Sequence, residues 1–121
     1  MSNTKNTGKQ PEHSILKIRA STTDRIGSRL LYQYIVELAR ERGITGATVY
    51  RGIMGYGSSS KISSSRFWEL TEKLPVVIEL IDRTEKLQKF YETIREDLVN
   101  MPKGCVVALE PVEVLLQKKG K

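Results

Sequence analysis

The sequence predicts an α+β domain in which two helices cover one face of a four-stranded antiparallel sheet. Apolar residues recur at helical spacing in two segments, and short runs of strand-forming residues lie before, between and after these segments. The chain has 121 residues, which is enough for one domain with a modest core. The predicted element order is therefore β-α-β-β-α-β.

The first strand is expected at residues 15–20, where apolar side chains flank two basic ones. Residues 21–27 are predicted to form a polar connection, and Ser28 is predicted to cap the first helix. The apolar positions of that helix follow its period: Leu31, Ile35, Leu38 and Ala39. Gly43 is expected to end the helix, just after two basic residues.

A second strand is expected at residues 45–53, which contain good strand formers. Residues 54–65 hold two glycines and six serines, and this composition predicts a loop. A third extended region is expected at residues 66–82, interrupted near residues 72–75.

Asp82 is predicted to cap the second helix, with Glu85 three residues later completing a pair that resembles a capping box. The clearest helical stripe of the chain follows: Leu87, Phe90, Tyr91, Ile94 and Leu98. The last strand is expected at residues 105–116. With short, right-handed connections, this order gives the ferredoxin-like fold, here spanning residues 14–116 between a disordered leader (1–13) and a basic tail (117–121).

Composition narrows the class of protein. A formal net charge of +6 and a pI near 9.6 favour an anionic partner without choosing one. With one histidine and one cysteine, a zinc site from a single subunit is excluded, and Cys105 is expected to be a buried thiol. No apolar run is long enough to span a bilayer and residues 1–13 lack the apolar region of a signal peptide, so we expect a cytoplasmic protein without membrane insertion.

The apolar pattern of the later strands predicts association between copies. Val76, Ile78 and Leu80 point to one side of the third strand, whereas Val77 and Ile81 point to the other. The last strand has a similar two-sided pattern. Two helices cover one face of a sheet, so apolar residues on the open face favour oligomerisation; a loop or tail folded over that face is the alternative.

Residues 51–61 are the most unusual segment of the chain. Glycines 52, 55 and 57 permit close approach of a ligand and positive φ, and successive N–H groups in such a loop can bind an anion. Serine hydroxyls and the cations of Arg51, Lys61 and Arg66 suit a phosphate-bearing small molecule. The alternative is an ordinary flexible hairpin, and the spacing matches neither a P-loop nor a dinucleotide-binding motif.

Several segments resemble the PII-like proteins called domain-of-unknown-function family 190, over residues 15–115. The matching segments are residues 31–32, 35–40, 43–49, 51–57 and 74–79, of which Gly46-Ala47-Thr48-Val49 to Gly55-Tyr56-Gly57 is the most specific. The resemblance implies a ferredoxin-like homotrimer that binds adenine nucleotides in clefts between subunits. It also implies that the loop after the second strand grips a target, often a transporter or channel.

The same resemblance implies a set of binding residues. Gly55-Tyr56-Gly57 matches the Gly-Phe-Gly at the loop base of PII proteins, whereas the last strand lacks their Arg-x-Arg pair, so AMP or ADP is expected over ATP. No further cofactor is expected. The nucleotide-binding set expected here is Arg51, Gly52, Met54, Gly55, Tyr56, Gly57, Ser58, Lys61, Arg66 and Lys103.

Alternatives stay open for single residues and for the function. Asp24 and Arg25 either line the cleft or are solvated turn residues, and Arg51 either binds the ligand or pairs with Glu79. Phe67 and Trp68 are expected at an interface or in the core. No nucleophile, base and orienting group are visible as a set, so we expect no enzyme and no catalytic residue. A ligand-free scaffold, or an RNA-binding module of the same fold, is the alternative function. Nucleic acid is not expected, because neither the first strand nor residues 76–81 of the third contain an aromatic residue.

Overall fold

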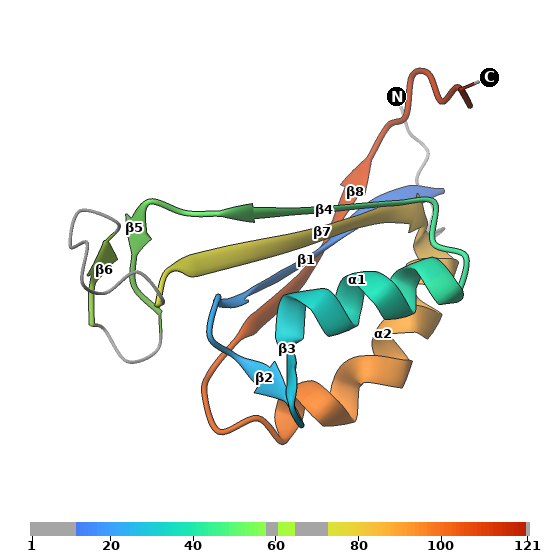
Figure 1. The fold of residues 1–121 in the computed structure, drawn as a ribbon. Helices are drawn as coiled ribbons and strands as arrows, with labels where there is room; N and C mark the ends of the chain where they lie inside the picture. Colours follow the sequence, from blue (N-terminus) through green and yellow to red (C-terminus); the bar gives the residue numbers. More distant parts are fainter. Residues whose placement is uncertain (1–11, 58–60, 65–72, 121) are drawn as a thin grey trace.

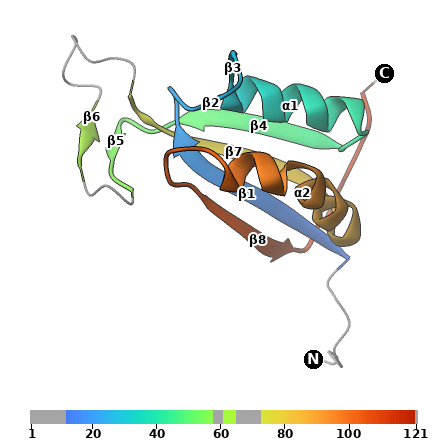
Figure 2. The same ribbon diagram turned by 90° about the horizontal axis from the view of Figure 1, so that it is seen from below.

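The computed structural model describes residues 12–57, 61–64 and 73–120, and it confirms the predicted architecture (Figure 1). Its elements are β1 (His13–Ser21), β2 (Arg25–Ile26), β3 (Arg29–Leu30), α1 (Leu31–Glu41), β4 (Gly46–Arg51), β5 (Met54–Gly55), β6 (Ser63–Ser64), β7 (Pro75–Arg83), α2 (Thr84–Val99) and β8 (Val106–Val112). The main sheet has four antiparallel strands in the order β4-β7-β1-β8. Both helices lie on the same face of this sheet (Figures 1 and 2).

The core lies between the sheet and the helices, as the apolar pattern predicts. Alternate residues of the central strands are buried there, among them Leu16, Ile18, Ile78 and Leu80. The predicted stripe of α2 faces them, with Leu87, Phe90, Ile94 and Leu98 buried and Tyr91 half-buried. From α1, Leu31, Ile35 and Ala39 complete the core.

Ser28 does not cap the first helix, contrary to the prediction. Residues 25–30 form a tight hairpin of β2 and β3, and Gly27 turns it with a φ of +62°. Leu30 is the N-cap of α1 and no side chain caps the helix. The N–H of Leu31 instead donates to the carbonyl of Asp24 at 2.7 Å, so a backbone contact from the preceding turn replaces the cap. Gly43 ends the helix as predicted, with a φ of +79°.

Asp82 also differs from its predicted role. The N-cap of α2 is Arg83, and no side-chain capping bond is present. Asp82 is the penultimate residue of β7, and its Oδ2 accepts hydrogen bonds from the Thr45 N–H at 2.9 Å and the Thr45 hydroxyl at 3.1 Å. The carboxylate therefore ties the turn after α1 to the end of β7.

Some strands end at other residues than expected, because the strand propensity of a segment does not determine which of its residues pair with a neighbouring strand. The second strand of the sheet, β4, ends at Arg51, and β8 ends at Val112, so residues 113–116 extend past the sheet. Within the predicted loop, Met54–Gly55 pairs with Ser63–Ser64 as a short hairpin. The expectations for Phe67 and Trp68 lie outside the described residues.

The open face of the sheet combines apolar patches with a polar ladder. Lys17 of β1 lies 2.9 Å from a carboxylate oxygen of Glu110 and 3.9 Å from one of Glu79, which also accepts a hydrogen bond from the Tyr50 hydroxyl. The contact with Glu110, first as a hydrogen bond and then through its charge, raises the pKa of Lys17. On either side of this ladder lie Ile15 paired with Ile81, and Val77 with Val106 across Arg19. Val77 and Ile81 thus face the open side, as their alternation predicts.

Candidate functional site

Four connections meet at one end of the sheet, at the carboxyl ends of β1 and β4 and the amino ends of β7 and β8 (Figure 1). Backbone hydrogen bonds tie the connections after β1 and after β4 to the start of β7. The Thr22 N–H donates to the Leu74 carbonyl at 2.9 Å, and the Gly52 N–H donates to the Pro75 carbonyl at 2.8 Å. The Leu74 N–H also donates to the Thr22 hydroxyl at 3.1 Å. The start of β7 therefore sets the position of the loop base, defined here as residues 52–57.

The turn after β1 is fixed by Asp24, a residue that is 6% exposed. Its Oδ2 accepts a hydrogen bond from the Ser21 N–H at 2.9 Å, while its own carbonyl receives the first N–H of α1. Asp24 is thus a buried structural residue and not a solvated turn residue. Arg25 follows it at the surface and donates to the Ser28 carbonyl at 2.9 Å.

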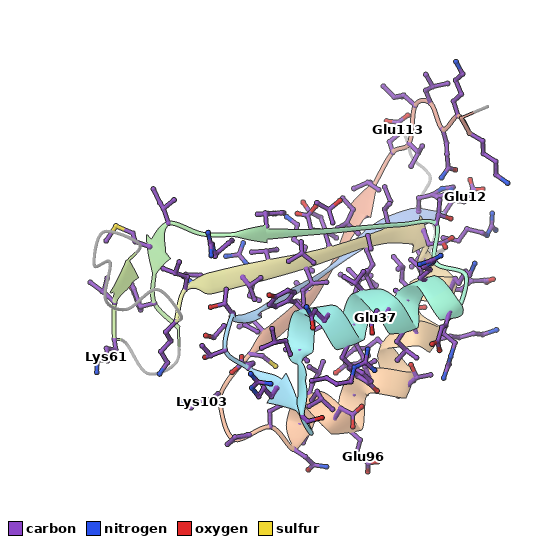
Figure 3. The ribbon with its side chains drawn as sticks, viewed as in Figure 1. Glu12, Glu37, Lys61, Glu96, Lys103 and Glu113 are labelled. Carbon is purple, nitrogen blue, oxygen red and sulfur yellow. The ribbon has the colours of Figure 1, made fainter. Side chains whose placement is uncertain are left out.

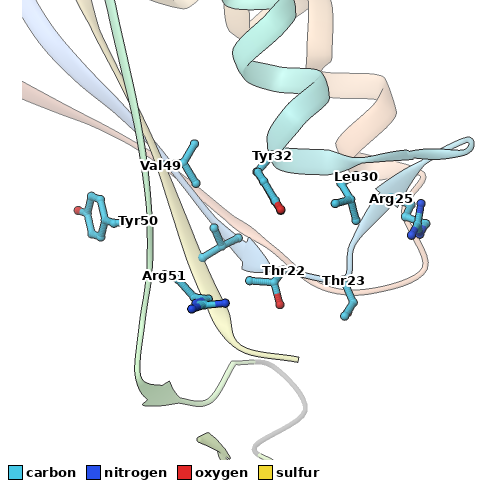
Figure 4. Close-up of a pocket in the computed structure, with 9 residues that line it drawn as sticks. Thr22, Thr23, Arg25, Leu30, Tyr32, Val49, Tyr50 and Arg51 are labelled. Carbon is cyan, nitrogen blue, oxygen red and sulfur yellow. The ribbon is translucent and has the colours of Figure 1, made fainter. Parts of the chain in front are cut away.

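A cleft of about 770 Å³ opens between this turn and strand β4 (Figure 4). Hydroxyl groups, two guanidinium groups and apolar side chains line it together, which suits a ligand with both an apolar body and polar substituents. The lining residues are Thr22, Thr23, Arg25, Leu30, Tyr32, Val49, Tyr50, Arg51 and Val76. In Figure 4, Thr22, Tyr32 and Arg51 lie around the same space, whereas the ring of Tyr50 projects from the other side of β4.

Arg51 is the predicted binding residue that lines this cleft. Strand alternation places it on the same side as Val49, whereas Glu79 lies on the open face. The alternative pairing of Arg51 with Glu79 is therefore wrong, since Glu79 contacts Tyr50 and Lys17 there. The Arg51 guanidinium is exposed and directed at a cleft, where an anionic group could accept its hydrogen bonds.

Gly52 and Gly55 at the loop base permit close packing, and none of the three loop-base glycines has a positive φ. The left-handed glycines that the structure describes are Gly27 and Gly43, and the loop-base residues Gly52, Gly55 and Gly57 are not among them. A Cβ on Gly52 would lie 3.4 Å from the Pro75 Cβ, and one on Gly55 would lie 3.0 Å from the Pro75 Cγ. The positive φ predicted for these glycines is therefore wrong, and the close approach of a ligand stays a prediction; the close neighbour of Gly52 and Gly55 within the chain is Pro75.

The β5–β6 hairpin extends beyond the sheet from this loop base (Figure 1). Its described part exposes apolar side chains: Ile53 at 75%, Met54 at 52%, Tyr56 at 72% and Ile62 at 62%. Together with exposed Lys61, they form a projecting surface that the rest of the described chain leaves in solvent. Such a surface is suited to contact with another macromolecule.

Three lysines, Lys61, Lys73 and Lys103, are near enough to one another for their charges to interact. The like charge of neighbouring Lys103 lowers the pKa of Lys73, and burial and the charge of Lys61 lower it further. Figure 3 shows Lys61 and Lys103 at the same end of the molecule. Like charges held together favour an anion between them, because a bound anion relieves the repulsion.

The structure thus divides the predicted set among three places. Arg51 lines the cleft, and Gly52, which does not, follows it and bonds to Pro75. Met54, Gly55, Tyr56, Gly57 and Lys61 belong to the hairpin, and Lys103 interacts with Lys73. Ser58 and Arg66 lie outside the described residues. Sequence reasoning missed Thr22, Tyr32 and Lys73, and the polar run after the first strand was the one available signal for Thr22.

Two further observations bear on chemistry. Within the described ranges, no cluster of histidine, cysteine, aspartate and glutamate could hold a metal ion, and no helix is long and apolar enough to cross a membrane. Cys105 is half-buried, less than expected, and burial, followed by the charge of Asp24, raises the pKa of its thiol.

This fold, with a loop that leaves the sheet after its second long strand, has the PII-like architecture, and comparison with solved structures agrees. The nitrogen-regulatory PII-like protein CPII of Thiomonas intermedia, bound to ADP, AMP and bicarbonate, has a TM-score of 0.60 at 15% identity, over 84% of this chain and 93% of that one. A putative PII-like signalling protein of Thermus thermophilus has a TM-score of 0.57 at 18% identity, over 83% and 86%.

The chain belongs to the DUF190 family, described as an uncharacterised conserved family, whose profile matches residues 13–114. A UPF0166 protein of Aquifex aeolicus is 38% identical over 84% of this chain and 91% of its own length. A UPF0166 protein of Methanocaldococcus jannaschii is 38% identical over 77% of this chain and 89% of its own. The resemblance inferred from the sequence is therefore confirmed.

Proposed function

We propose that this protein is a PII-like regulatory protein of the cytoplasm that binds an adenine nucleotide, AMP or ADP, and acts without catalysis. The observation that carries the proposal is the cleft beside Arg51, which lies at the base of the β5–β6 hairpin. A ligand in this cleft contacts β4 directly before the chain enters the hairpin, so its binding can change the hairpin's position.

The chemistry of the cleft fits the parts of a nucleotide. Leu30, Val49 and Tyr32 offer apolar and aromatic surface for a base, and the Thr22 and Thr23 hydroxyls offer hydrogen-bonding groups for a ribose. Arg51 and Arg25 supply positive charge for phosphate. CPII, which shares the fold, was crystallised with ADP and AMP, and this supports the choice of an adenine nucleotide.

The cleft is open on the outer side of β4, an edge strand. We propose that a neighbouring copy closes it in a homotrimer and that its Lys73–Lys103 pair approaches the phosphates from across the seam. The apolar patches on the open face support association, since exposed apolar area favours burial between copies.

The hairpin is the proposed output surface, toward a transporter or channel. Its exposed Ile53, Met54, Tyr56 and Ile62 form an apolar tip that such a partner could bury. Sedimentation and a pull-down with and without nucleotide would show whether binding changes capture of a candidate partner.

Calorimetric titration with AMP, ADP, ATP and cyclic AMP tests the nucleotide proposal. We expect micromolar affinity for at least one of them, about −8 kcal/mol. Arg51→Gln should weaken that binding about tenfold, which corresponds to about 1.4 kcal/mol. Arg95→Gln on the exposed face of α2 removes the same charge away from the cleft and should leave the affinity unchanged. Absence of heat with every nucleotide would favour a ligand-free scaffold.

A further inference from the structure

The chain that follows β8 forms an arm, defined here as residues 113–120. After Val112 it rises from the sheet on the side opposite to the helices (Figure 1). In Figure 3, Glu113 stands on that side, whereas Glu37 of α1 and Glu96 of α2 lie on the other. Seen from the helix side, the arm passes behind the strands from the β8 edge toward the β4 edge (Figure 2). It thus extends into the space in front of the open face.

The arm carries two leucines that its own chain leaves in water. Leu115 is 88% exposed and Leu116 is 81% exposed, the highest values among the large apolar side chains that the structure describes. Two adjacent leucines on a projecting segment do not add to the core of this chain. They are available for burial in another molecule.

The open face has an apolar surface of matching kind at the end where the arm begins. Ile15 and Ile81 are direct partners across β1 and β7, and both are half-buried. Next to Ile81 in the same row is Gly46, where an added Cβ would lie 3.0 Å from the Ile81 Cγ2. Since Gly46 has no side chain, the Ile81 side chain lies over it, and Ile81 and Ile15 together present an apolar surface against which a leucine side chain can pack.

The arm and the row of cross-strand partners Gly46, Ile81, Ile15 and Glu110 also carry opposite charges. Glu110, directly opposite Ile15 on β8, is half exposed, with 52% of its side chain in solvent. The arm carries Lys118 and Lys119 shortly after its leucines. An extended chain advances about 3.3 Å per residue, so these ammonium groups can reach a carboxylate one or two strands away from the leucines.

We propose that the arm is a clasp between copies: Leu115 and Leu116 of one chain bind the Ile15–Ile81 surface beside Gly46 of a second copy, with Lys118 and Lys119 near its Glu110. This inference rests on the association of copies in the proposed function and adds the segment that secures it. The partner is a second copy because the arm leaves its own sheet and keeps its leucines exposed.

Mixed-chain crosslinking tests the contact. In a Cys105→Ser background, a Leu116→Cys chain is mixed with a longer, tagged Ile81→Cys chain and oxidised. We expect a covalent heterodimer, and we expect much less with Glu92→Cys, an exposed position of α2, in place of Ile81→Cys. A chain carrying both Leu116→Cys and Ile81→Cys that closes on itself at high dilution would overturn the proposal.

Sedimentation velocity over a concentration series measures the contribution of the arm. The Leu115→Ser/Leu116→Ser variant should dissociate at a concentration at least tenfold higher than the unchanged chain. Val99→Ser, which alters a 62% exposed apolar residue at the end of α2, should not. Equal dissociation of both variants would overturn the clasp while leaving the trimer in place. A monomeric unchanged chain would overturn both.

Discussion

Gly55 of β5 lies against Pro75, the first residue of β7: a Cβ added to Gly55 would come within 3.0 Å of the proline Cγ. This contact seats the base of the projecting hairpin on a central strand of the sheet. Because Pro75 also accepts the Gly52 N–H, one residue positions both ends of the connection between β4 and β5.

Gly55→Ala should therefore displace the hairpin base. We expect faster amide exchange at residues 54–57 and a stability loss of about 1 kcal/mol, because the ring of Pro75 has to move aside. Gly57→Ala is the matched control, since nothing lies within 4 Å of a Cβ there. Hydrogen exchange measured by mass spectrometry compares the two, and equal exchange in both variants would contradict the contact.

Lys103 and Lys73 provide a test of the phosphate-binding part of the proposal. Lys103→Gln should weaken AMP and ADP binding about tenfold. Adenosine binding should stay unchanged, because adenosine has no phosphate for the lysines to contact. Lys89→Gln, at an exposed position of α2, is the control. Equal weakening of adenosine and AMP binding would show that Lys103 acts through the structure of the site instead of through charge.

Asp82 should contribute to stability through its bonds to the turn after α1. Asp82→Ala removes the acceptor for Thr45 and leaves the Thr45 N–H without it, at a cost of about 2–3 kcal/mol. Glu96→Gln alters an exposed carboxylate of α2 and should change stability by less than about 0.5 kcal/mol. Urea unfolding at pH 7 measures both, and similar midpoints would contradict this role.

Through the same carboxylate, the stability of the fold should depend on pH in the acid range. Burial opposes ionisation of Asp82, but hydrogen bonds from Arg83 and Thr45 outweigh it, and the pKa of Asp82 is lowered. A lowered folded-state pKa gives stability that is present above the unfolded value, about 3.9, and is lost as pH falls through the folded value. The difference between the unchanged chain and Asp82→Asn should therefore shrink below about pH 4. A difference that is constant from pH 7 to pH 3 would contradict this.

Through Tyr34, the stability of the fold should also depend on pH in the alkaline range. Its hydroxyl donates to Asp97 at 2.8 Å, and this bond, followed by burial and the charge of Asp97, raises the pKa of Tyr34. Its contribution is complete below the unfolded value, about 10, and is lost as pH rises through the folded value. Tyr34→Phe should cost about 1 kcal/mol at pH 7 and less above pH 10. Tyr91→Phe, a half-buried tyrosine of α2, is the comparison, and equal costs at all pH values would contradict the expectation.

Ile78 and Val77 are neighbours on β7 that face opposite sides of the sheet. Ile78→Ala should destabilise each chain by about 2–5 kcal/mol, because the side chain is fully buried beneath the helices. Val77→Ser should leave the fold of the single chain intact and weaken association. Thermal unfolding and sedimentation separate the two effects. An unchanged oligomer in Val77→Ser would place the interface elsewhere.

The sequence by itself determined the order of long elements and the core face of each. Ile35 and Leu87 belong to helical periods, and Ile78 belongs to a strand with two apolar sides; both patterns follow from local geometry. The family resemblance also came from contiguous residues. For these reasons the sheet, the two helices and the position of the loop base were predictable.

The tertiary structure decided the contacts between residues far apart in the chain. Asp82 bonds to Thr45 instead of capping its own helix, and Thr22 joins Arg51 at a cleft that no sequence spacing indicates. The charge of Lys103 acts on Lys73 because the connections before β7 and before β8 come to one end of the sheet. The pairing of the strands decides which distant residues come together. The local preferences of short segments specify neither the register of that pairing nor which loops lie at the same end of the sheet.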